Sequence, residues 1–325
     1  MKRICRLALV LLLSAAPALA DDDGMRVDRS CLATVWAPDD AELAGAENWR
    51  DDGGRLSLAT RAPGGGSAIR MFSRADQPAD LASYKIHIRA ADRTKAGFAR
   101  IRAEFFIPAD TRFNVGGAKM PLGLYGGAPN EKRTCATGGC PPEKQTGFSV
   151  RLTRDPPDEA RPWEHGPRIY SYHLNRDSRR VDFEDSHSHR KGDFDELQYG
   201  ENFPMGVAFP LGEWFTLTLD VAVNRATETQ IVADGFADLY MHDAQGNLMG
   251  HVAAERLIFR QGEAWHLFGP LLADLWGGDQ TLPTRMPIMD TEMYSRQYRL
   301  SLLDEGRSLS ECLDPARLPA GWPRG

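Results

Sequence analysis

Apolar and polar residues alternate along much of this chain, whereas the three- to four-residue spacing of amphipathic helices is scarce. The clearest alternation lies at 215–224, where apolar residues occupy every second position and polar residues most of the others. Successive side chains of a strand point to opposite faces, so this run predicts an antiparallel strand with one buried and one exposed face. Shorter runs of this kind lie at 84–89, 99–107, 147–152, 168–174, 235–241, 256–260 and 296–302.

Many short strands joined by turns rich in Gly, Pro, Asn and Asp are typical of two-sheet antiparallel folds. The pattern therefore predicts an all-β fold, a β-jelly roll or two-sheet antiparallel β-sandwich. Neither a Ser/Gly/Pro-rich linker nor an internal repeat divides the chain, so residues 21–325 are expected to form a single domain. Within it, 128–144 and 175–202 are predicted to be loops, and 314–325 a poorly ordered tail.

The N-terminal residues have the three parts of a secretory signal. Three basic residues precede an apolar stretch at 7–13, and Ala-Leu-Ala at 18–20 forms a small-residue cleavage site. The apolar stretch is too short for a membrane-spanning helix. Residues 1–20 are therefore predicted to be a signal peptide, and the mature protein is expected to be secreted or periplasmic, without a membrane anchor.

Removal of that leader makes an acidic protein more acidic. The loss of Lys2, Arg3 and Arg6 lowers the formal net charge by three, from −6 to −9. Nonspecific nucleic-acid binding needs a basic surface, so this class of partner is not expected. A local cationic cleft can still lie on an acidic protein, which leaves an anionic polysaccharide open as the partner. The oligomeric state is not indicated by the sequence.

Four cysteines follow the leader, and an even number in an exported chain favours two disulfides. Cys135 and Cys140 flank Ala-Thr-Gly-Gly, a tight loop that suits a bond between them. Cys31 and Cys312 would then tie the two ends of the domain together. A zinc site built from all four is the alternative, but the long gaps between them resemble no compact zinc finger.

Candidate functional residues occur in pairs spaced as on strands. Ser149 and Arg151 form one pair, Tyr170 and Tyr172 a second, and Lys119 precedes both in a Gly-rich segment. Residues i and i+2 of a strand share a face and lie about 6.5 Å apart. If these segments are strands of one sheet, two cations, a hydroxyl and two phenols line one surface. Such a surface suits an anionic sugar from which a proton is removed.

These residues lie in segments that resemble a known enzyme family. The segment 116–127 (GGAKMPLGLYGG), followed by 147–151 (GFSVR) and 170–172 (YSY), is similar to ordered motifs of jelly-roll polysaccharide lyases of family 14. Those enzymes act on alginate and related polyuronates, and their relatives in family 20 act on glucuronan. Further similar motifs lie at 210–214, 259–260 and 276–278, so the resemblance extends from about 98 to 302. Ala118, Leu122 and the insertion at 135–140 depart from the family pattern.

The resemblance implies β-elimination, in which the C5 proton beside a uronate carboxylate is removed and the 4-O-glycosidic bond breaks. Lys119 and Arg151 would bind the carboxylate and stabilise the developing negative charge, with a hydrogen bond from Ser149. Tyr170 and Tyr172 would serve as base and acid, in an order that the sequence does not fix. A nearby cation favours a phenolate, which makes a tyrosine base chemically reasonable. No cofactor and no metal are implied.

Each of these residues also has a structural interpretation. Lys119 could be a solvated loop cation, Arg151 could form a structural ion pair, and the two tyrosines could pack on a sheet face, where Tyr is favoured. The rival function is a noncatalytic carbohydrate-binding sandwich that holds an anionic glycan.

Three further features carry weaker hypotheses. His187 and His189 have a spacing suited to two metal ligands, but interleaved Arg and Lys residues indicate a solvated loop. The acidic stretch 193–196 loosely resembles the paired carboxylates of glycoside hydrolases, without their usual strand arrangement. His173 follows Tyr172 and is expected to face the other side of its strand, in a structural role.

Overall fold

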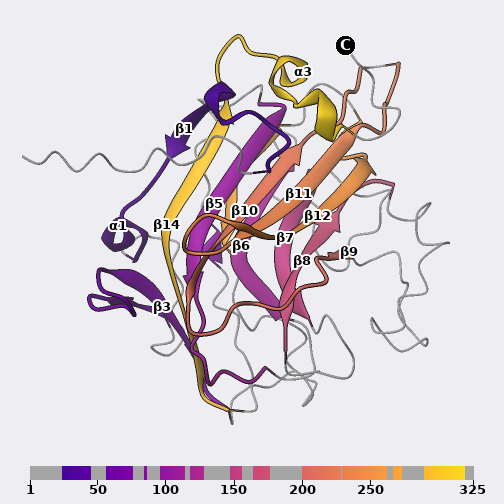
Figure 1. Ribbon diagram of the computed structural model, residues 1–325. Helices are drawn as coiled ribbons and strands as arrows, with labels where there is room; N and C mark the ends of the chain where they lie inside the picture. Colours follow the sequence, from indigo (N-terminus) through magenta and orange to yellow (C-terminus); the bar gives the residue numbers. More distant parts are fainter. Residues whose placement is uncertain are drawn as a thin grey trace, which may run out of the picture.

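Two antiparallel β-sheets pack face to face in the computed structural model of this chain (Figure 1). The structure describes residues 24–44, 56–75, 84–85, 96–113, 118–127, 147–155, 164–175, 200–227, 229–261, 266–272 and 289–318. The predicted signal peptide, the 128–144 loop and Cys135 and Cys140 lie outside these residues. Within them, no helix is long and apolar enough to cross a membrane.

The larger sheet is built from β1 (Leu32–Trp36), β2 (Leu56–Ala59), β3 (Ala68–Ser73), β5 (Phe98–Phe106), β10 (Trp214–Ala222), β11 (Gly235–His242), β12 (Leu248–Leu257) and β14 (Thr291–Leu303). The smaller sheet is built from β4 (Tyr84–Lys85), β6 (Ala118–Gly127), β7 (Gly147–Asp155), β8 (Gly166–Tyr172), β9 (Glu201–Pro204) and β13 (His266–Leu272). Short helical turns are η1 (Arg29–Cys31), α1 (Asp40–Ala44), α3 (Leu309–Cys312) and η7 (Pro315–Arg317).

Runs of strands that follow one another in sequence, such as β6 to β9 and β10 to β12, lie side by side in one sheet, and the chain crosses between the sheets from one run to the next. In the larger sheet the strand order is β12-β11-β10-β5-β14-β3-β2, with β1 also paired to β14, and in the smaller sheet it is β4-β13-β6-β7-β8-β9. The strand pairs within the described residues are antiparallel, as between β7 and β8 or β10 and β5. The predicted all-β, two-sheet antiparallel sandwich is therefore confirmed.

Apolar side chains at alternate strand positions fill the space between the layers. The larger sheet contributes Phe105 and Leu217, and the smaller sheet contributes Phe148, Val150 and Leu152, all at most 1% exposed. Burying such side chains contributes about 25 cal/mol per Å² of apolar surface. Because strand residues alternate, their neighbours in the smaller sheet must face away from this core.

The outer face of the larger sheet is not the exposed polar face that the sequence predicted for 215–224. Asp220 in β10 is fully buried and accepts two hydrogen bonds of 2.7 Å from the Arg100 guanidinium. Arg100 also donates to the carbonyl of Val27, at 3.0 Å. Asp220 is buried because the N-terminal segment lies over this part of the sheet, and the ion pair with Arg100 compensates its charge.

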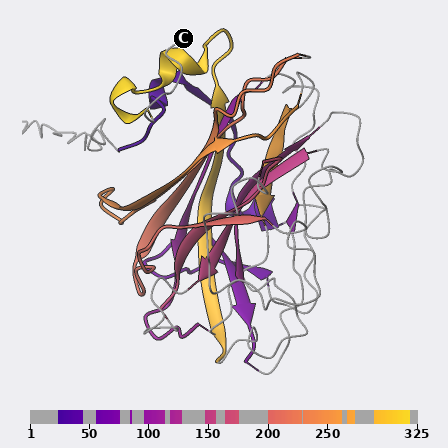
Figure 2. The ribbon, with the colours of Figure 1, turned by 90° about the vertical axis from the view of Figure 1, so that its right-hand side faces the viewer.

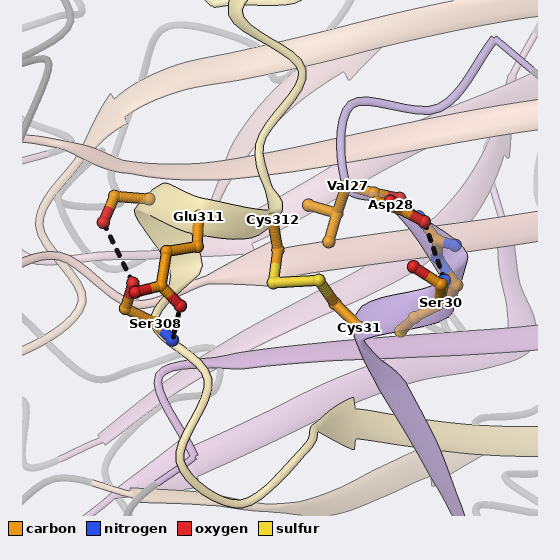
Figure 3. The surroundings of a disulfide bond; sticks show 9 residues. Val27, Asp28, Ser30, Cys31, Ser308, Glu311 and Cys312 are labelled. Carbon is orange, nitrogen blue, oxygen red and sulfur yellow. Dashed lines mark hydrogen bonds between the residues drawn. A yellow bond between two sulfur atoms is a disulfide. The ribbon is translucent and has the colours of Figure 1, made fainter.

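A second, smaller core joins the two ends of the described chain over this face. It contains Val27, Cys31, Phe98, Ala222, Phe236, Cys312 and Leu313. The predicted disulfide between Cys31 and Cys312 is confirmed, with Cα atoms 6.0 Å apart (Figure 3). Figures 1 and 2 both show the N-terminal (indigo) and C-terminal (yellow) segments side by side at one end of the sandwich.

Several predicted boundaries need correction. The segment 314–318 is not a disordered tail, since Asp314 donates its N–H to the carbonyl of Arg26 and precedes η7. The strand predicted at 256–260 is mainly wrong, because β12 ends at Leu257. The loop predicted over 175–202 includes the first two residues of β9, and its residues 176–199 lie outside the described part.

Candidate active site

Three adjacent strands of the smaller sheet, β6, β7 and β8, carry the candidate residues. Across β7 and β8, Ser149 is paired with Tyr172 and Arg151 with Tyr170. The alternate residues of β7 lie in the core between the sheets, so these four side chains share the face that points away from it. Lys119 in β6 belongs to the same face, because its neighbour Met120 is a core residue. The structure thus brings all five predicted site residues to one surface.

The position of Lys119 within this surface depends on an irregularity in β6. Met120 is paired with Leu152 of β7, whereas the next paired residue, Gly123, lies opposite Arg151. Two extra residues therefore lie in β6 at this point, as in a β-bulge. Lys119 consequently lies opposite Thr153, which is two residues from Arg151 along β7 and on the same face. The sequence departure at Leu122 falls within this irregularity.

The two tyrosines are in direct contact. Their hydroxyl oxygens are 3.0 Å apart, and their rings meet edge to face with centroids 5.2 Å apart. Tyr172 is only 2% exposed, whereas Tyr170 is half-buried. The backbone N–H of Gly200, which directly precedes β9, donates to the hydroxyl oxygen of Tyr170 at 3.0 Å. A proton can pass between the two phenols without rearrangement of the backbone.

Arg151 is the buried cation of this surface, at 8% exposed. Its Nε donates to the Ser149 hydroxyl at 3.2 Å, and its guanidinium carbon lies 5.6 Å from the centre of the Tyr172 ring. Burial lowers the pKa of Arg151, and the negative charge that Tyr172 and Tyr170 can carry opposes this shift. A buried cation interacts strongly with an anion that reaches it, because little water screens the pair.

Three residues of this surface, Arg168, Thr153 and Gly200, were missed in the sequence. Arg168 lies two residues before Tyr170 on the same face of β8, and it is paired with Thr153, which is paired with Lys119 on its other side. The Oγ1 atom of Thr153 is buried and has no hydrogen-bond partner within the described chain. The spacing Arg168-x-Tyr170-x-Tyr172 is a signal that would have found Arg168. No residue spacing in the sequence would have identified Gly200, because this residue reaches the site only through the pairing of β8 with β9.

His173 lies on the opposite face, as expected. It is fully buried, with Nδ1 at 2.8 Å from Asn175 Oδ1 and Nε2 at 2.7 Å from Glu201 Oε2. His187, His189 and the acidic stretch 193–196 lie outside the described residues. Within the described part of the chain, no group of three or more His, Cys, Asp or Glu side chains could hold a metal ion.

Comparison with solved structures identifies the same sandwich in several enzymes. The alginate lyase of family PL-14 from Aplysia kurodai is 19% identical, with a TM-score of 0.59 over 82% of this chain and 98% of its own. The alginate lyase vAL-1 from Chlorella virus is 13% identical, with a TM-score of 0.53 over 83% of this chain and 100% of its own. The alginate lyase Aly36B is 11% identical, with a TM-score of 0.53 over 85% and 97%. These likenesses establish the fold.

The family itself is identified from the sequence. No curated protein matches the chain. The model of the family described as Polysaccharide lyase 14, however, matches residues 70–286, which is about two thirds of the chain and contains the five predicted site residues. The chain therefore belongs to the polysaccharide lyase 14 family.

Proposed function

We propose that this protein is an exported polysaccharide lyase that cleaves a uronic-acid-containing polysaccharide, of the alginate or glucuronan class, by β-elimination. The observation that carries the proposal is the pair of hydrogen-bonded tyrosine hydroxyls, 3.0 Å apart, beside the buried guanidinium of Arg151. Membership of a family of polysaccharide lyases supports it. So does the similar fold of Aly36B, two mutants of which have been solved in complex with an alginate tetrasaccharide and an alginate trisaccharide.

The residues match the electronic needs of the reaction. Arg151, and Lys119 on the same face, bind the uronate carboxylate and stabilise the negative charge that develops when C5 loses its proton. One tyrosine takes that proton as a phenolate. The C5–H electron pair forms the C4–C5 double bond, the C4–O4 bond breaks, and O4 leaves with a proton from an acidic phenol. The products are a new chain end and an unsaturated uronate.

Arg168 and Thr153 extend the surface toward a second sugar. Every residue of a polyuronate carries a carboxylate, and the two cations that bind the carboxylate of the reacting sugar leave the charge of the neighbouring sugar unmatched. Arg168 lies about two strand spacings from Lys119, with the Thr153 hydroxyl between them. We assign Arg168 and Thr153 to the carboxylate and hydroxyls of the sugar adjacent to the one that reacts.

Export rests on the leader-like residues 1–20 and is supported by the disulfide. The bond between Cys31 and Cys312 joins the two terminal segments, and such bonds persist mainly in oxidising compartments. The mature protein is therefore proposed to act outside the cytoplasm, in the periplasm or the medium.

The test is the ultraviolet absorbance of the purified mature protein mixed with alginate blocks, glucuronan or pectate. β-Elimination creates a double bond conjugated to the carboxylate, so absorbance rises as product forms. The rise should vanish in Tyr170→Phe and Tyr172→Phe, while binding of oligouronates is retained. Tyr294→Phe, on the larger sheet, is the matched control and should keep activity. Binding without any rise in absorbance would instead identify a noncatalytic glycan-binding protein.

A further inference from the structure

The residue before β9 supplies a fixed hydrogen-bond donor to the site. The N–H of Gly200 lies 3.0 Å from the hydroxyl oxygen of Tyr170. A backbone N–H can only donate, so the Tyr170 oxygen is the acceptor of this bond in both of its protonation states. Hydrogen bonds to a charged oxygen are about twice as strong as those to a neutral one. The contact therefore favours Tyr170 most when it is a phenolate.

The close approach of the two residues requires glycine at position 200. A Cβ atom there would lie 2.9 Å from Cζ of Tyr170 and 2.9 Å from the carbonyl oxygen of Ser171. Any larger residue would push the backbone away from the tyrosine and lengthen the bond. The chain thus has the smallest residue where the donor must lie against the ring.

A buried pair on the other face holds this segment in place. Glu201 directly follows Gly200, and its carboxylate lies 2.7 Å from Nε2 of His173, which directly follows β8. His173 is fully buried, and the Glu201 side chain is 12% exposed. The contact therefore joins the start of β9 to the end of β8. Gly200 directly precedes β9, and Tyr172 is the last residue of β8.

The hydrogen bonds around Asn175 determine which ring nitrogen of His173 donates to it. Asn175 Oδ1 accepts from the N–H of Ile258 at 2.9 Å, and its Nδ2 donates to the carbonyl of Arg256 at 2.9 Å. The amide orientation is thereby fixed, so His173 Nδ1 must donate to Oδ1. The remaining contact, from Nε2 to the Glu201 carboxyl, then holds one proton between the ring and the acid. Asn175 also connects the pair to the end of β12, in the other sheet.

We propose that the His173–Glu201 pair is a positioning device that holds the Gly200 N–H on Tyr170, and that Tyr170 is the tyrosine that carries negative charge during β-elimination. The assignment rests on the proposed function. It is strengthened by exposure, since half-buried Tyr170 can be reached by the substrate more directly than Tyr172, which is 2% exposed. Tyr172 then donates to Tyr170 and serves as the proton source for O4.

Glu201→Ala tests the device, and Glu201→Gln is the conservative rescue. Glu201→Ala removes the contact with His173 and should lower kcat on a polyuronate by about 10- to 100-fold, because the Gly200 donor is displaced but not lost. KM should change by less than about threefold. The acid limb of the kcat–pH profile should move upward by about one unit, because Tyr170 loses a donor to its phenolate. Glu201→Gln keeps a hydrogen bond to His173 and should restore most of both quantities. Glu213→Ala, at an exposed glutamate before β10, is the control and should match the wild type.

The direction of the pH shift identifies its cause, because loss of the negative charge of Glu201 would by itself favour the phenolate and move the limb downward, whereas loss of the Gly200 donor moves it upward. Gly200→Ala removes no charge. Among the described side chains on the Tyr170 face, the charged or titratable ones are Lys119, Arg151, Arg168, Tyr125 and Tyr172. Gly200→Ala is the second variant and should give the same signature through displacement of the donor. An unshifted pH limb in both Glu201→Ala and Gly200→Ala, whatever their kcat, would overturn the proposal.

A measurement without substrate separates this inference from the lyase function. Ultraviolet titration of tyrosinate in the wild type minus that in Tyr170→Phe isolates the ionisation of Tyr170. The same difference is then measured between Glu201→Ala and the double variant Glu201→Ala/Tyr170→Phe. The midpoint should lie about one pH unit lower in the first difference, in which Glu201 is present, than in the second. If polyuronates give no unsaturated product but the midpoints differ, the positioning stands and the proposed function fails. Coincident midpoints overturn the positioning, whatever the activity.

Discussion

The disulfide between Cys31 and Cys312 should be a major source of stability for this protein. It joins residues 281 positions apart and lies inside the small core that covers the outer face of the larger sheet (Figure 3). Replacing both cysteines by alanine removes the cross-link without burying a new polar group, since Cys31 and Cys312 are 3% and 1% exposed. We expect the double variant to fold and to be markedly less stable.

The magnitude follows from the length of the closed loop. Cross-linking residues 281 apart removes about 19 cal/mol/K of entropy from the unfolded chain, or about 5.6 kcal/mol at 25 °C. Residual structure in the unfolded chain reduces this value, because the two ends are then partly restrained already. We therefore expect the free energy of unfolding to fall by about 3–5 kcal/mol.

The assay is urea unfolding followed by tryptophan fluorescence, with kcat measured below the lowered Tm. The double variant should keep kcat, because the cross-link lies over the larger sheet and the candidate site on the smaller one. The single variant Cys31→Ala is the control, since it already breaks the bond and should reach most of the same loss. A loss below about 1 kcal/mol in the double variant would refute the loop-entropy reasoning.

Two further substitutions test the surfaces on either side of the sandwich. Arg168→Gln should raise KM for polymeric polyuronate about tenfold and make KM less dependent on salt concentration, because a charge-assisted contact to the carboxylate of the neighbouring sugar is lost. The control is Arg112→Gln, at an exposed arginine, which should leave KM unchanged. An unchanged KM in Arg168→Gln would contradict the assignment of Arg168 to the neighbouring sugar. Asp220→Ala leaves Arg100 buried without its carboxylate and should lower the free energy of unfolding by about 3–5 kcal/mol, with kcat retained. Thermal or urea unfolding measures that loss, and a loss below about 1 kcal/mol would show that Arg100 is solvated by other means.

The local part of the site could be predicted from the sequence because strand geometry is local. Side chains two residues apart must share a face, so Ser149 with Arg151, and Tyr170 with Tyr172, could be grouped without knowledge of the pairing. The same rule applied to Arg168 would have added the third cation. The alternation of apolar residues likewise predicted the two-sheet class and the core strands.

Features that depend on contacts between distant segments could not be predicted in this way. The alternation at 215–224 predicted an exposed face, but the terminal segments cover that face and Arg100 neutralises Asp220 there. The end of β12 at Leu257 depends on its pairing with β11, which a short run of residues does not encode.

The sequence by itself predicted the fold class, the Cys31–Cys312 pairing and the residues that face together on β7 and β8, because these follow from strand periodicity and from the number and spacing of the cysteines. Only the tertiary structure decided the register that places Lys119 opposite Thr153 and the approach of Gly200 to Tyr170. The contact of His173 with Glu201 was also decided there. The physical reason is that register and inter-strand contacts depend on the free energy of the whole packed sandwich, to which each local segment contributes only a small part.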